Sequence, residues 1–584
     1  MAFLGVRHDE AVAKVAGWVR GRFREATQLS SVDLTRWSAW DITAGWIIPR
    51  EPSGCLHLLL DRFFPYSEPI FCVTGSPALL QSPHIERGGK ICVTGNTGRV
   101  DPDSPSVVVE ELFSQVERLL EANAAGENDA DFIDDFVAYW SRSVGDDKRL
   151  HTLFELRPPS RLVVTAYGHA LTVVAENEQV ARQFFRNYQG RAQGVSTQAA
   201  CALWLNSLPA PAEYPSDVVG LRDLVEKCSD AGLAILDELL EEGHDKLHAV
   251  LMGPTKNGIG AAGGVVIDAV SDNRARRAIQ DNLNRGFRRG HTPAQVMAQR
   301  YRLSRLSVNR IEQAKSRRPA YLSNELLTKT VCVIGCGSLG SGVAKLLLQS
   351  GVGSLKLIDP EVMTWANTER HELGAASVGK NKAQELANHF SRNYPLCGGV
   401  IAYKNQWQEV LRAEPEMFGK ADLVLSTCAN WNAECALNDA HRAGQFSGPV
   451  LYGWLEDYAI AGHALAIGGG GTCLRCGFSK TGEVLVPVSR SAPPHVPGCG
   501  GGASPYGAID MAPTQAMIAS LALDLLLGRA SAPVYRVSIS PKATFASADA
   551  DYSFEWLSQY GEPPCGGTIT AGFWRQNENC VCHS

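Results

Sequence analysis

Residues 330–340, TVCVIGCGSLG, constrain the fold of this 584-residue chain more than any other stretch of its sequence. An uninterrupted apolar strand ends in a G-x-G-x-x-G loop, and the helical pattern SGVAKLLLQSG follows. Gly335 permits the tight turn, Gly337 lets backbone amides approach a phosphate, and Gly340 lets the helix pack close to the strand. The helix start supplies free N–H groups and a positive dipole end. The stretch therefore predicts a nucleotide site.

Residues 326–584 continue this alternation of apolar strands and helices. The runs follow one another in the order SLKLID, KAQELANHFSRN, VIAYK and ADLVLSTC. Continuous apolar strands between helices are typical of a parallel sheet that helices cover on both faces. The segment is therefore predicted to be a doubly wound, Rossmann-like α/β domain.

Charged side chains after the second strand bear on the identity of the nucleotide. Asp359 ends that strand, 19 residues past Gly340, where an acid can bind ribose hydroxyls. The glycine pattern alone suits NAD as readily as ATP. Asn367, Arg370 and Lys382 lie where the next connection can fold over the nucleotide. Cationic groups there suit a triphosphate that loses pyrophosphate better than a nicotinamide that transfers hydride.

The overall charge and hydropathy argue against several classes of partner. The net charge of −6 gives no electrostatic case for nucleic acid or an anionic membrane, and the basic stretch 274–290 is interpreted as a solvated helix face. No run reaches the ~20 apolar residues of a membrane span, and the first residues lack the pattern of a signal peptide. We therefore expect a cytoplasmic protein, in which the 16 cysteines are not a disulfide framework.

The motifs GCGSLG, LIDPEVMTWANTERH, VGKNK and ADLVLSTCAN occur in this order over roughly residues 326–530. Together they resemble the adenylating superfamily of ubiquitin-activating enzymes and their bacterial ThiF-type relatives. The resemblance implies that Asp359 binds the ribose of ATP, while Asn367, Arg370 and Lys382 surround the phosphates. It also implies a reaction, in which a protein C-terminal carboxylate becomes an acyl-adenylate and a cysteine thiolate then captures the acyl group.

Ala429 departs from the pattern of that superfamily. Its members usually carry an aspartate just before the asparagine of this motif, where the carboxylate helps to hold Mg²⁺. This chain has Ala429 before Asn430. Either Mg²⁺ is bound through the triphosphate and other groups, or the geometry of the metal differs.

The resemblance places the activating-site nucleophile in a Pro/Gly-rich loop, VPVSRSAPPHVPGCGGGASPYG, just before a strongly apolar helix. The matching loop of the family crosses over the active site and often carries the sulfur nucleophile. Flexible surroundings would let Cys499 reach an adenylate. Cys499 is therefore the predicted nucleophile, and Cys565 in EPPCGGT is the alternative.

Two cysteine pairs near the end of the chain indicate a metal site. Cys473 and Cys476 form CLRC, and Cys580 and Cys582 lie in NCVCH, beside His583. The resembling family often has two such pairs as a tetrahedral structural zinc site, although the distal pair here is spaced C-x-C. Four soft ligands can close on Zn²⁺, so these four cysteines are the candidate ligands.

Residues 1–145 predict an α+β domain in which a helix, a strand meander, a cysteine loop and a second helix follow one another. LDRFFPYSEPIFCVTG and SPHIERGGKICV resemble the ubiquitin-conjugating fold, whose acceptor cysteine would be Cys92. The His-Pro-Asn of that family is absent, and the chain instead has His84-Ile85-Glu86. Oxyanion stabilisation must therefore come from elsewhere, with backbone amides or His84 as candidates.

Residues 158–325 alternate strand and helix patterns and contain no motif that carries chemistry, so we expect a packed, linking α/β domain. The order of all three segments resembles the fused ubiquitin-transferase-like enzymes of bacterial CBASS antiphage operons. The resemblance implies a homodimer that acts on the C-terminus of a cGAS-like nucleotidyltransferase and attaches it to an acceptor amine that the sequence does not identify. The alternatives are an adenylyltransferase for a sulfur-carrier or ubiquitin-like protein with a non-catalytic N-terminal recruitment domain, and a non-catalytic nucleotide-binding scaffold.

Overall fold

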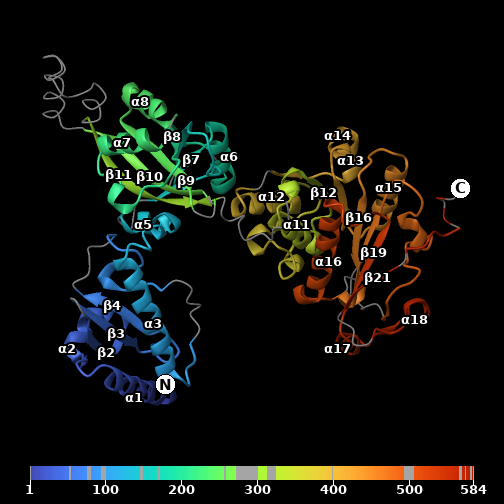
Figure 1. Ribbon diagram of the computed structural model, residues 1–584. Helices are drawn as coiled ribbons and strands as arrows, with labels where there is room; N and C mark the ends of the chain where they lie inside the picture. Colours follow the sequence, from blue (N-terminus) through green and yellow to red (C-terminus); the bar gives the residue numbers. More distant parts are fainter. Residues whose placement is uncertain are drawn as a thin grey trace. The chain divides into compact units, whose positions relative to one another are not determined.

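A computed structural model gives the structure of the chain (Figure 1). It describes residues 2–582 except 51–53, 75–79, 94–99, 145–148, 169–170, 191, 230, 256–257, 259, 271–299, 312–323, 397–398, 492–504, 564–567, 573, 579 and 581. The chain divides into two compact units, one of residues 1–181 and 196–311 and the other of residues 182–195 and 312–584. The basic stretch 274–290 lies outside the described residues.

The first unit begins with an antiparallel sheet in the order β1-β2-β3-β4, against which two long helices pack (Figure 1). Its elements are α1 (Ala2–Arg22), β1 (Thr27–Gln28), α2 (Ser31–Leu34), η1 (Thr35–Trp40), β2 (Ile42–Pro49), β3 (Cys55–Asp61), β4 (Ile70–Thr74), η2 (Arg87–Gly89), α3 (Pro105–Ala124), α4 (Asp131–Asp134) and α5 (Phe136–Arg142). Alternate residues of β3, Leu56, Leu58 and Leu60, join Val15 of α1 in one core, because successive strand side chains point to opposite faces. The predicted helix–meander–helix order is confirmed, although residues 131–140 form two short helices.

The rest of the first unit is a closed barrel in the order β10-β11-β5-β7-β6-β8-β9. Its strands are β5 (Arg149–Thr152), β6 (Arg161–Gly168), β7 (Leu171–Ala175), β8 (Ser196–Trp204), β9 (Lys246–Pro254), β10 (Gly260–Ala269) and β11 (Tyr301–Arg310), and its helices are η3 (Pro211–Glu213), α7 (Val218–Cys228) and α8 (Gly232–Glu242). Helix α6 (Glu178–Gln189) begins in the first unit, and most of it belongs to the second. The barrel occupies the segment expected to link the two outer domains, and its strand β5 lies before residue 158. The four-residue strand β5 is too short to be recognised from sequence, and its partner β11 lies far along the chain.

The second unit is built on a sheet in the order β14-β13-β12-β15-β16-β17-β19-β21. Its elements are η5 (Asn324–Thr328), β12 (Thr330–Ile334), α11 (Ser338–Ser350), β13 (Ser354–Ile358), η6 (Trp365–Asn367), η7 (Ala375–Ser377), α12 (Lys382–Asn393), β14 (Gly399–Tyr403), α13 (Trp407–Ala413), α14 (Pro415–Gly419), β15 (Leu423–Ser426), α15 (Trp431–Arg442), β16 (Val450–Leu455), η8 (Asp457–Ala459), β17 (Ala461–Ile467), η9 (Leu474–Gly477), β18 (Ser489–Arg490), α16 (Ala508–Leu526), β19 (Val534–Ile539), α17 (Lys542–Ser547), β20 (Asp551–Tyr552), α18 (Phe554–Tyr560) and β21 (Thr568–Gly572). The strands from β14 to β16 pair in parallel, whereas β17, β19 and β21 extend the sheet in antiparallel pairing.

Both faces of this sheet are covered, as the sequence predicts. Val331 and Val333 of β12 pack with residues of α11, α12 and α16 on one face. Cys332 and Ile334 pack with residues of α13, α14 and α15 on the other. Because the strand buries both sets of alternating side chains, its sequence is apolar without interruption. The predicted doubly wound fold is confirmed for the parallel part of the sheet.

Helix α16 is long and apolar enough to cross a membrane by length and composition, which is weak evidence for a span. Its Ile518, Leu521 and Ala522 are fully buried in the core that α11 and β12 share. Burial in this core accounts for the apolar sequence of the helix.

Candidate functional site

A cavity of about 500 Å³ lies at the carboxyl ends of β12, β13 and β15. Parallel sheets of this kind bind ligands at that edge, where the connections leave the strands. The lining includes the predicted residues Gly335, Gly337, Asp359 and Lys382. It also includes Ile334, Ile358, Pro360, Glu361, Gln406, Trp407, Gln408, Thr427, Cys428, Asn430, Asn432 and Ala433.

The three glycines of the loop differ in what surrounds them. Gly335 has a φ of +86°, a left-handed conformation that glycine adopts without strain. A side chain at Gly340 would collide with the carbonyl oxygen of Gly335, so this position lets α11 start close to the strand. At Gly337, no described atom lies within 4 Å of where a Cβ would stand. This open space at the start of α11 is where a phosphate can approach the backbone.

Asp359 is buried and held in a fixed orientation at the edge of the cavity. Its carboxylate accepts hydrogen bonds from the N–H groups of Cys336 at 2.7 Å and Glu361 at 2.8 Å. Burial raises the pKa of Asp359, although the two amide bonds favour the charged form. The side chain is therefore positioned before any ligand arrives.

Lys382 is the cation of the cavity. Its side chain is only 7% exposed, and its Nζ lies 2.6 Å from Oε2 of Glu361, whose side chain is 70% exposed. The ammonium group of Lys382, at the start of α12, is therefore held at the cavity by Glu361, whose exposed side chain has room to rotate away. A phosphate group can replace that partner, because it offers the same negative charge.

Asn367 and Arg370 are not among the described residues that line the cavity. The Oδ1 atom of Asn367 accepts hydrogen bonds from the N–H and the hydroxyl of Thr364, at 3.0 and 2.9 Å. The Arg370 guanidinium stacks on the ring of Tyr506, 4.6 Å from its centre. The predicted phosphate contacts of these two residues stay predictions.

The structure adds residues at the end of β15 that the sequence pattern did not single out. Cys428 lines the cavity, and its Sγ lies 3.8 Å from Oε1 of the buried Glu434. Burial raises the pKa of Glu434 from 4.5 to about 7, although hydrogen bonds from Ser426 and Cys428 favour the charged form. Burial also raises the pKa of Cys428 to about 11, and Glu434 adds to the effect. Neither Cys428 nor Glu434 belongs to a recognisable motif, so the pair could not be predicted from the sequence.

Ala429, the residue that departs from the Mg²⁺-binding pattern, has a left-handed backbone conformation. Ala429 has a φ of +48°, in the left-handed region that asparagine and aspartate adopt more readily than alanine. The neighbouring Asn430 caps α15 by accepting a hydrogen bond from Ala433 N–H at 3.0 Å. The end of β15 therefore has the backbone turn that an aspartate would favour, but Ala429 supplies no carboxylate ligand.

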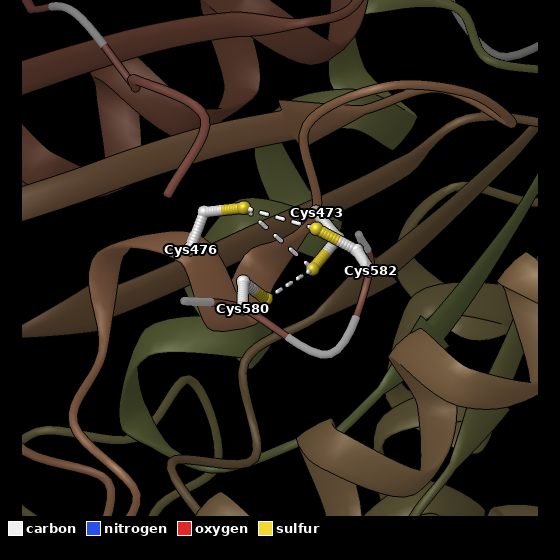
Figure 2. A group of neighbouring side chains, drawn as sticks. All are labelled: Cys473, Cys476, Cys580 and Cys582. Atoms are coloured by element: carbon white, nitrogen blue, oxygen red, sulfur yellow. Dashed lines mark hydrogen bonds between the residues drawn. The ribbon is translucent and has the colours of Figure 1, made fainter. Parts of the chain in front are cut away.

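The four predicted zinc ligands come together although they lie in segments about 100 residues apart (Figure 2). All four Sγ atoms lie within 4.8 Å of one another, with separations of 3.9 Å for Cys473–Cys476, 3.6 Å for Cys473–Cys580 and 3.4 Å for Cys476–Cys582. Sulfur atoms around a tetrahedral Zn²⁺ with ~2.3 Å bonds stand about 3.8 Å apart. The arrangement therefore fits a Cys₄ zinc site. His583 lies outside the described residues.

Hydrogen bonds from other side chains hold the two cysteine segments in place. The Trp574 indole donates to the carbonyl of Cys473 at 2.9 Å, and Arg442 donates to the carbonyl of Cys582 at 3.1 Å. Such outer contacts orient the ligands of a metal site.

Cys92 is exposed at the end of a hairpin that begins at His84. The turn contains Gly88 and Gly89, with φ of +79° and +80°, and a side chain at Gly89 would collide with the Val73 carbonyl oxygen. The Cys92 N–H donates to the carbonyl of His84 at 2.8 Å. That amide is therefore engaged within the hairpin, which leaves it less able to stabilise an oxyanion. Cys499 and its alternative Cys565 lie outside the described residues.

Comparison with known proteins identifies two domains in the chain. Residues 312–551 match the ThiF family, and residues 22–148 match Prokaryotic E2 family B. The two matches confirm the predicted fusion of a ubiquitin-conjugating-type domain with a ThiF-type domain.

Curated relatives match shorter segments. One is the ATP-dependent ubiquitin transferase-like protein Cap2 of Enterobacter hormaechei subsp. hoffmannii, 41% identical over 73 residues, which are 12% of each chain. The protein of the same name in Escherichia coli is 29% identical over 133 residues, or 22% of each chain. The sulfur carrier protein ThiS adenylyltransferase of Bacillus subtilis is 26% identical over 145 residues, 25% of this chain and 42% of the relative. The matches thus span less than half the length of these relatives.

Solved structures give weaker similarity. The crystal structure of E. coli MccB with MccA-N7isoASN is 16% identical, with a TM-score of 0.32 over 47% of this chain and 75% of that one. The structure of PaaA is 14% identical, with a TM-score of 0.31 over 49% of this chain and 83% of that one. At these TM-scores neither structure supports a functional assignment.

Proposed function

Because the chain joins a Prokaryotic E2 family B domain to a ThiF family domain, we propose that it activates a protein C-terminal carboxylate with ATP and conjugates it to an amine. The observation that carries the proposal is the cavity at the glycine loop, in which the buried Lys382 and Asp359 converge. The names of the relatives, an ATP-dependent ubiquitin transferase-like protein and a ThiS adenylyltransferase, support the same chemistry.

The residues of the cavity suit the first step, which is adenylation. A carboxylate oxygen of the substrate attacks the α-phosphorus of ATP, an O–P bond forms, and pyrophosphate leaves with the electron pair of the broken P–O bond. Asp359 accepts hydrogen bonds from the ribose hydroxyls, and the backbone N–H groups at the open position of Gly337 donate to a phosphate. Lys382 exchanges Glu361 for phosphoryl oxygens and offsets the charge that builds on them. No carboxylate at position 429 is available for Mg²⁺, so no step is assigned to that ion here.

Two cysteines carry the acyl group after activation. The thiolate of Cys499 attacks the acyl carbon, a C–S bond forms, and AMP leaves. The thiolate of Cys92 then takes the acyl group from Cys499, and an acceptor amine finally forms an amide as the Cys92 thiolate leaves. Joining both domains in one chain raises the effective concentration of each cysteine for the other. The exposure of Cys92 agrees with this transfer, since another protein's tail must reach the thiol.

The substrate that we propose is the C-terminus of a cGAS-like nucleotidyltransferase from the same CBASS operon, modified in the cytoplasm by a homodimer of this chain. Non-reducing electrophoresis of the two proteins with ATP tests the relay, and two thiol-sensitive adducts are expected. Cys92→Ala should remove one adduct and retain adenylation, whereas Cys499→Ser should give a stable ester or no activating-site adduct. A reducible activating-site adduct in Cys499→Ser would assign the nucleophile elsewhere. Full conjugation by Cys92→Ala would support a ThiS-type adenylyltransferase with a non-catalytic N-terminal domain.

Replacing the cavity cation tests adenylation separately. Lys382→Ala should lower ATP–pyrophosphate exchange with the nucleotidyltransferase by about 100-fold or more, because a preorganised cation is lost from the transition state. The matched control is Lys380→Ala, which removes a lysine whose side chain is 55% exposed and pairs with Glu385 at 3.4 Å. The control should exchange pyrophosphate like the wild type. Normal exchange in Lys382→Ala would place the phosphates elsewhere, and no exchange in the wild type would support a non-catalytic scaffold.

A further inference from the structure

His84 is tied to its surroundings through its backbone and its side chain. Its N–H donates to the Tyr139 hydroxyl at 2.8 Å, and its carbonyl accepts from the Cys92 N–H at 2.8 Å. Its Nε2 lies 2.8 Å from Oδ2 of Asp131. Because a carboxylate only accepts hydrogen bonds, Nε2 carries the hydrogen of this contact.

The backbone of His84 is in an uncommon conformation. Its φ is +60°, in the left-handed region that few non-glycine residues adopt, although histidine does so more often than most. The next residue, Ile85, pairs with Ile91, and both are buried in the core of the sheet. The left-handed turn sends the imidazole toward α4, where it is 4% exposed, while Cys92 stays exposed on the far strand of the hairpin.

The elements that hold His84 also hold the turn of the hairpin. Arg142 of α5 donates to Glu86 at 2.6 Å, and Glu86 N–H donates to the Lys90 carbonyl at 2.7 Å. Asp131 of α4 and Tyr139 of α5 therefore both bind His84, in the segment opposite Cys92, and we call these two helices the frame of the hairpin. Within this frame the His84 imidazole is covered, whereas the side chain of Asp131 is 34% exposed.

We propose that His84 and Asp131 are a positioning pair for the transfer reactions at Cys92. The imidazole is too buried to take a proton from an incoming amine, so its role is to fix the backbone of the cysteine strand. A fixed Cys92 sulfur keeps the face of the thioester carbonyl where an amine can attack it, which is the contribution of orientation to the rate. This inference rests on the proposed acyl transfer at Cys92, and it assigns residues that take no part in adenylation.

The reaction that tests the pair bypasses ATP. A short glycine-terminated peptide benzyl thioester supplies the acyl group to the full-length protein, and Cys92 thiolate attacks the carbonyl while benzyl thiolate leaves. Hydroxylamine nitrogen then attacks the Cys92 thioester, a C–N bond forms, and Cys92 leaves as a thiolate that solvent protonates. Mass spectrometry of the peptide containing Cys92 follows both steps, with Cys92→Ala as the blank.

Four variants separate positioning from charge and from misfolding. His84→Leu and Asp131→Ala remove the contact and should slow discharge at saturating hydroxylamine by about 10- to 100-fold. His84→Gln keeps a side-chain N–H donor and Asp131→Asn keeps an acceptor, so both should discharge within about threefold of the wild type, an estimate for retained orientation. The matched control is Asp134→Asn, which removes another carboxylate of α4 and leaves the His84–Asp131 pair in place. Thermal unfolding of each variant shows whether the domain is folded.

Every outcome either supports or overturns the proposed positioning pair. Wild-type discharge rates in folded His84→Leu and Asp131→Ala would overturn the pair while leaving the proposed function intact, and so would equal slowing in Asp134→Asn. Failure of His84→Gln and Asp131→Asn to restore discharge would show that the pair acts through something other than position, and would also overturn it. If Cys92 of the wild type accepts no acyl group from the thioester, the proposed function falls together with this inference.

Discussion

At the scale of single residues, Glu434 is a buried carboxyl group whose protonation depends on the fold. Burial raises its pKa from 4.5 to about 7, so between these pH values the folded protein binds a proton that the unfolded chain releases. Stability contributed by the neutral carboxyl is therefore present at low pH and is lost as the pH rises through the window. The same group lies against Cys428, which lines the nucleotide cavity.

Glu434→Gln should remove this pH dependence, because glutamine is neutral and its carbonyl can still accept the Ser426 hydroxyl, as Oε1 of Glu434 does at 2.9 Å. The variant and the wild type should unfold alike at pH 4, below the unfolded pKa of 4.5, and at pH 8 the variant should be more stable by roughly 1–3 kcal/mol. Thermal unfolding across this pH range measures the difference. The control Glu416→Gln, at an exposed position of α14, should follow the wild type at every pH. A constant gap between Glu434→Gln and the wild type would contradict the raised pKa.

At the scale of elements, the cysteine cluster joins two segments between which the described residues form no strand pairing. Cys473 and Cys476 flank and lie in η9, while Cys580 and Cys582 belong to the tail after β21. A bound Zn²⁺ would close this tail onto the sheet, and structural zinc contributes directly to folding. The small separations of the four sulfur atoms support such a site.

We expect the wild type to bind one Zn²⁺ at this cluster. Cys580→Ser should bind less zinc and should lower the thermal stability of the second unit, because one of four thiolates is replaced by a weaker ligand. Elemental analysis by mass spectrometry, after washing with a mild chelator, measures the metal. Cys435→Ser is the matched control, since this half-buried thiol of α15 lies outside the four-cysteine cluster. Wild-type protein without zinc would mean that the four thiols are a reduced structural cluster and nothing more.

At the scale of the molecule, α5 connects the cysteine hairpin to the barrel within the first unit. Tyr139 reaches His84, and the adjacent Trp140 is fully buried among residues of α7, α8 and the barrel strands β8, β9 and β10. The Trp140 indole donates to the Leu306 carbonyl of β11 at 2.8 Å, and its ring packs 4.8 Å from that of Tyr214. Gly263 of β10 leaves the space for this ring, because a Cβ there would collide with it.

Trp140→Ala should destabilise the first unit by about 3–5 kcal/mol through loss of the buried ring, and it should also slow discharge of the Cys92 thioester by loosening α5. Thermal unfolding and the hydroxylamine assay measure the two effects. The control Trp365→Ala removes an indole that is 71% exposed in the second unit and should change neither. Unchanged discharge in a folded, destabilised Trp140→Ala would show that the barrel supports the hairpin less than these contacts indicate.

Several local features could be predicted from the sequence alone. The run from Thr330 to Gly340 specifies a buried strand, a tight turn and a helix, because Gly335 adopts a positive φ in the turn and Gly340 leaves room for the Gly335 carbonyl oxygen. The position of Asp359 and the start of α12 at Lys382 also follow from local patterns, and these residues meet in the cavity because parallel strands end at one edge. The spacing of Cys473 and Cys476 similarly predicts a ligand pair.

Only the tertiary structure decided the contacts between distant segments. The closure of the barrel through β5 and β11, the antiparallel extension of the sheet, the burial of Glu434 and the meeting of His84 with Asp131 have no signature in local periodicity. Periodicity records which side of an element is buried, whereas the partner on that side depends on how the whole chain packs. For this protein the sequence by itself therefore determined most of the elements and the chemical groups that they carry, and the packing decided which of those groups lie together.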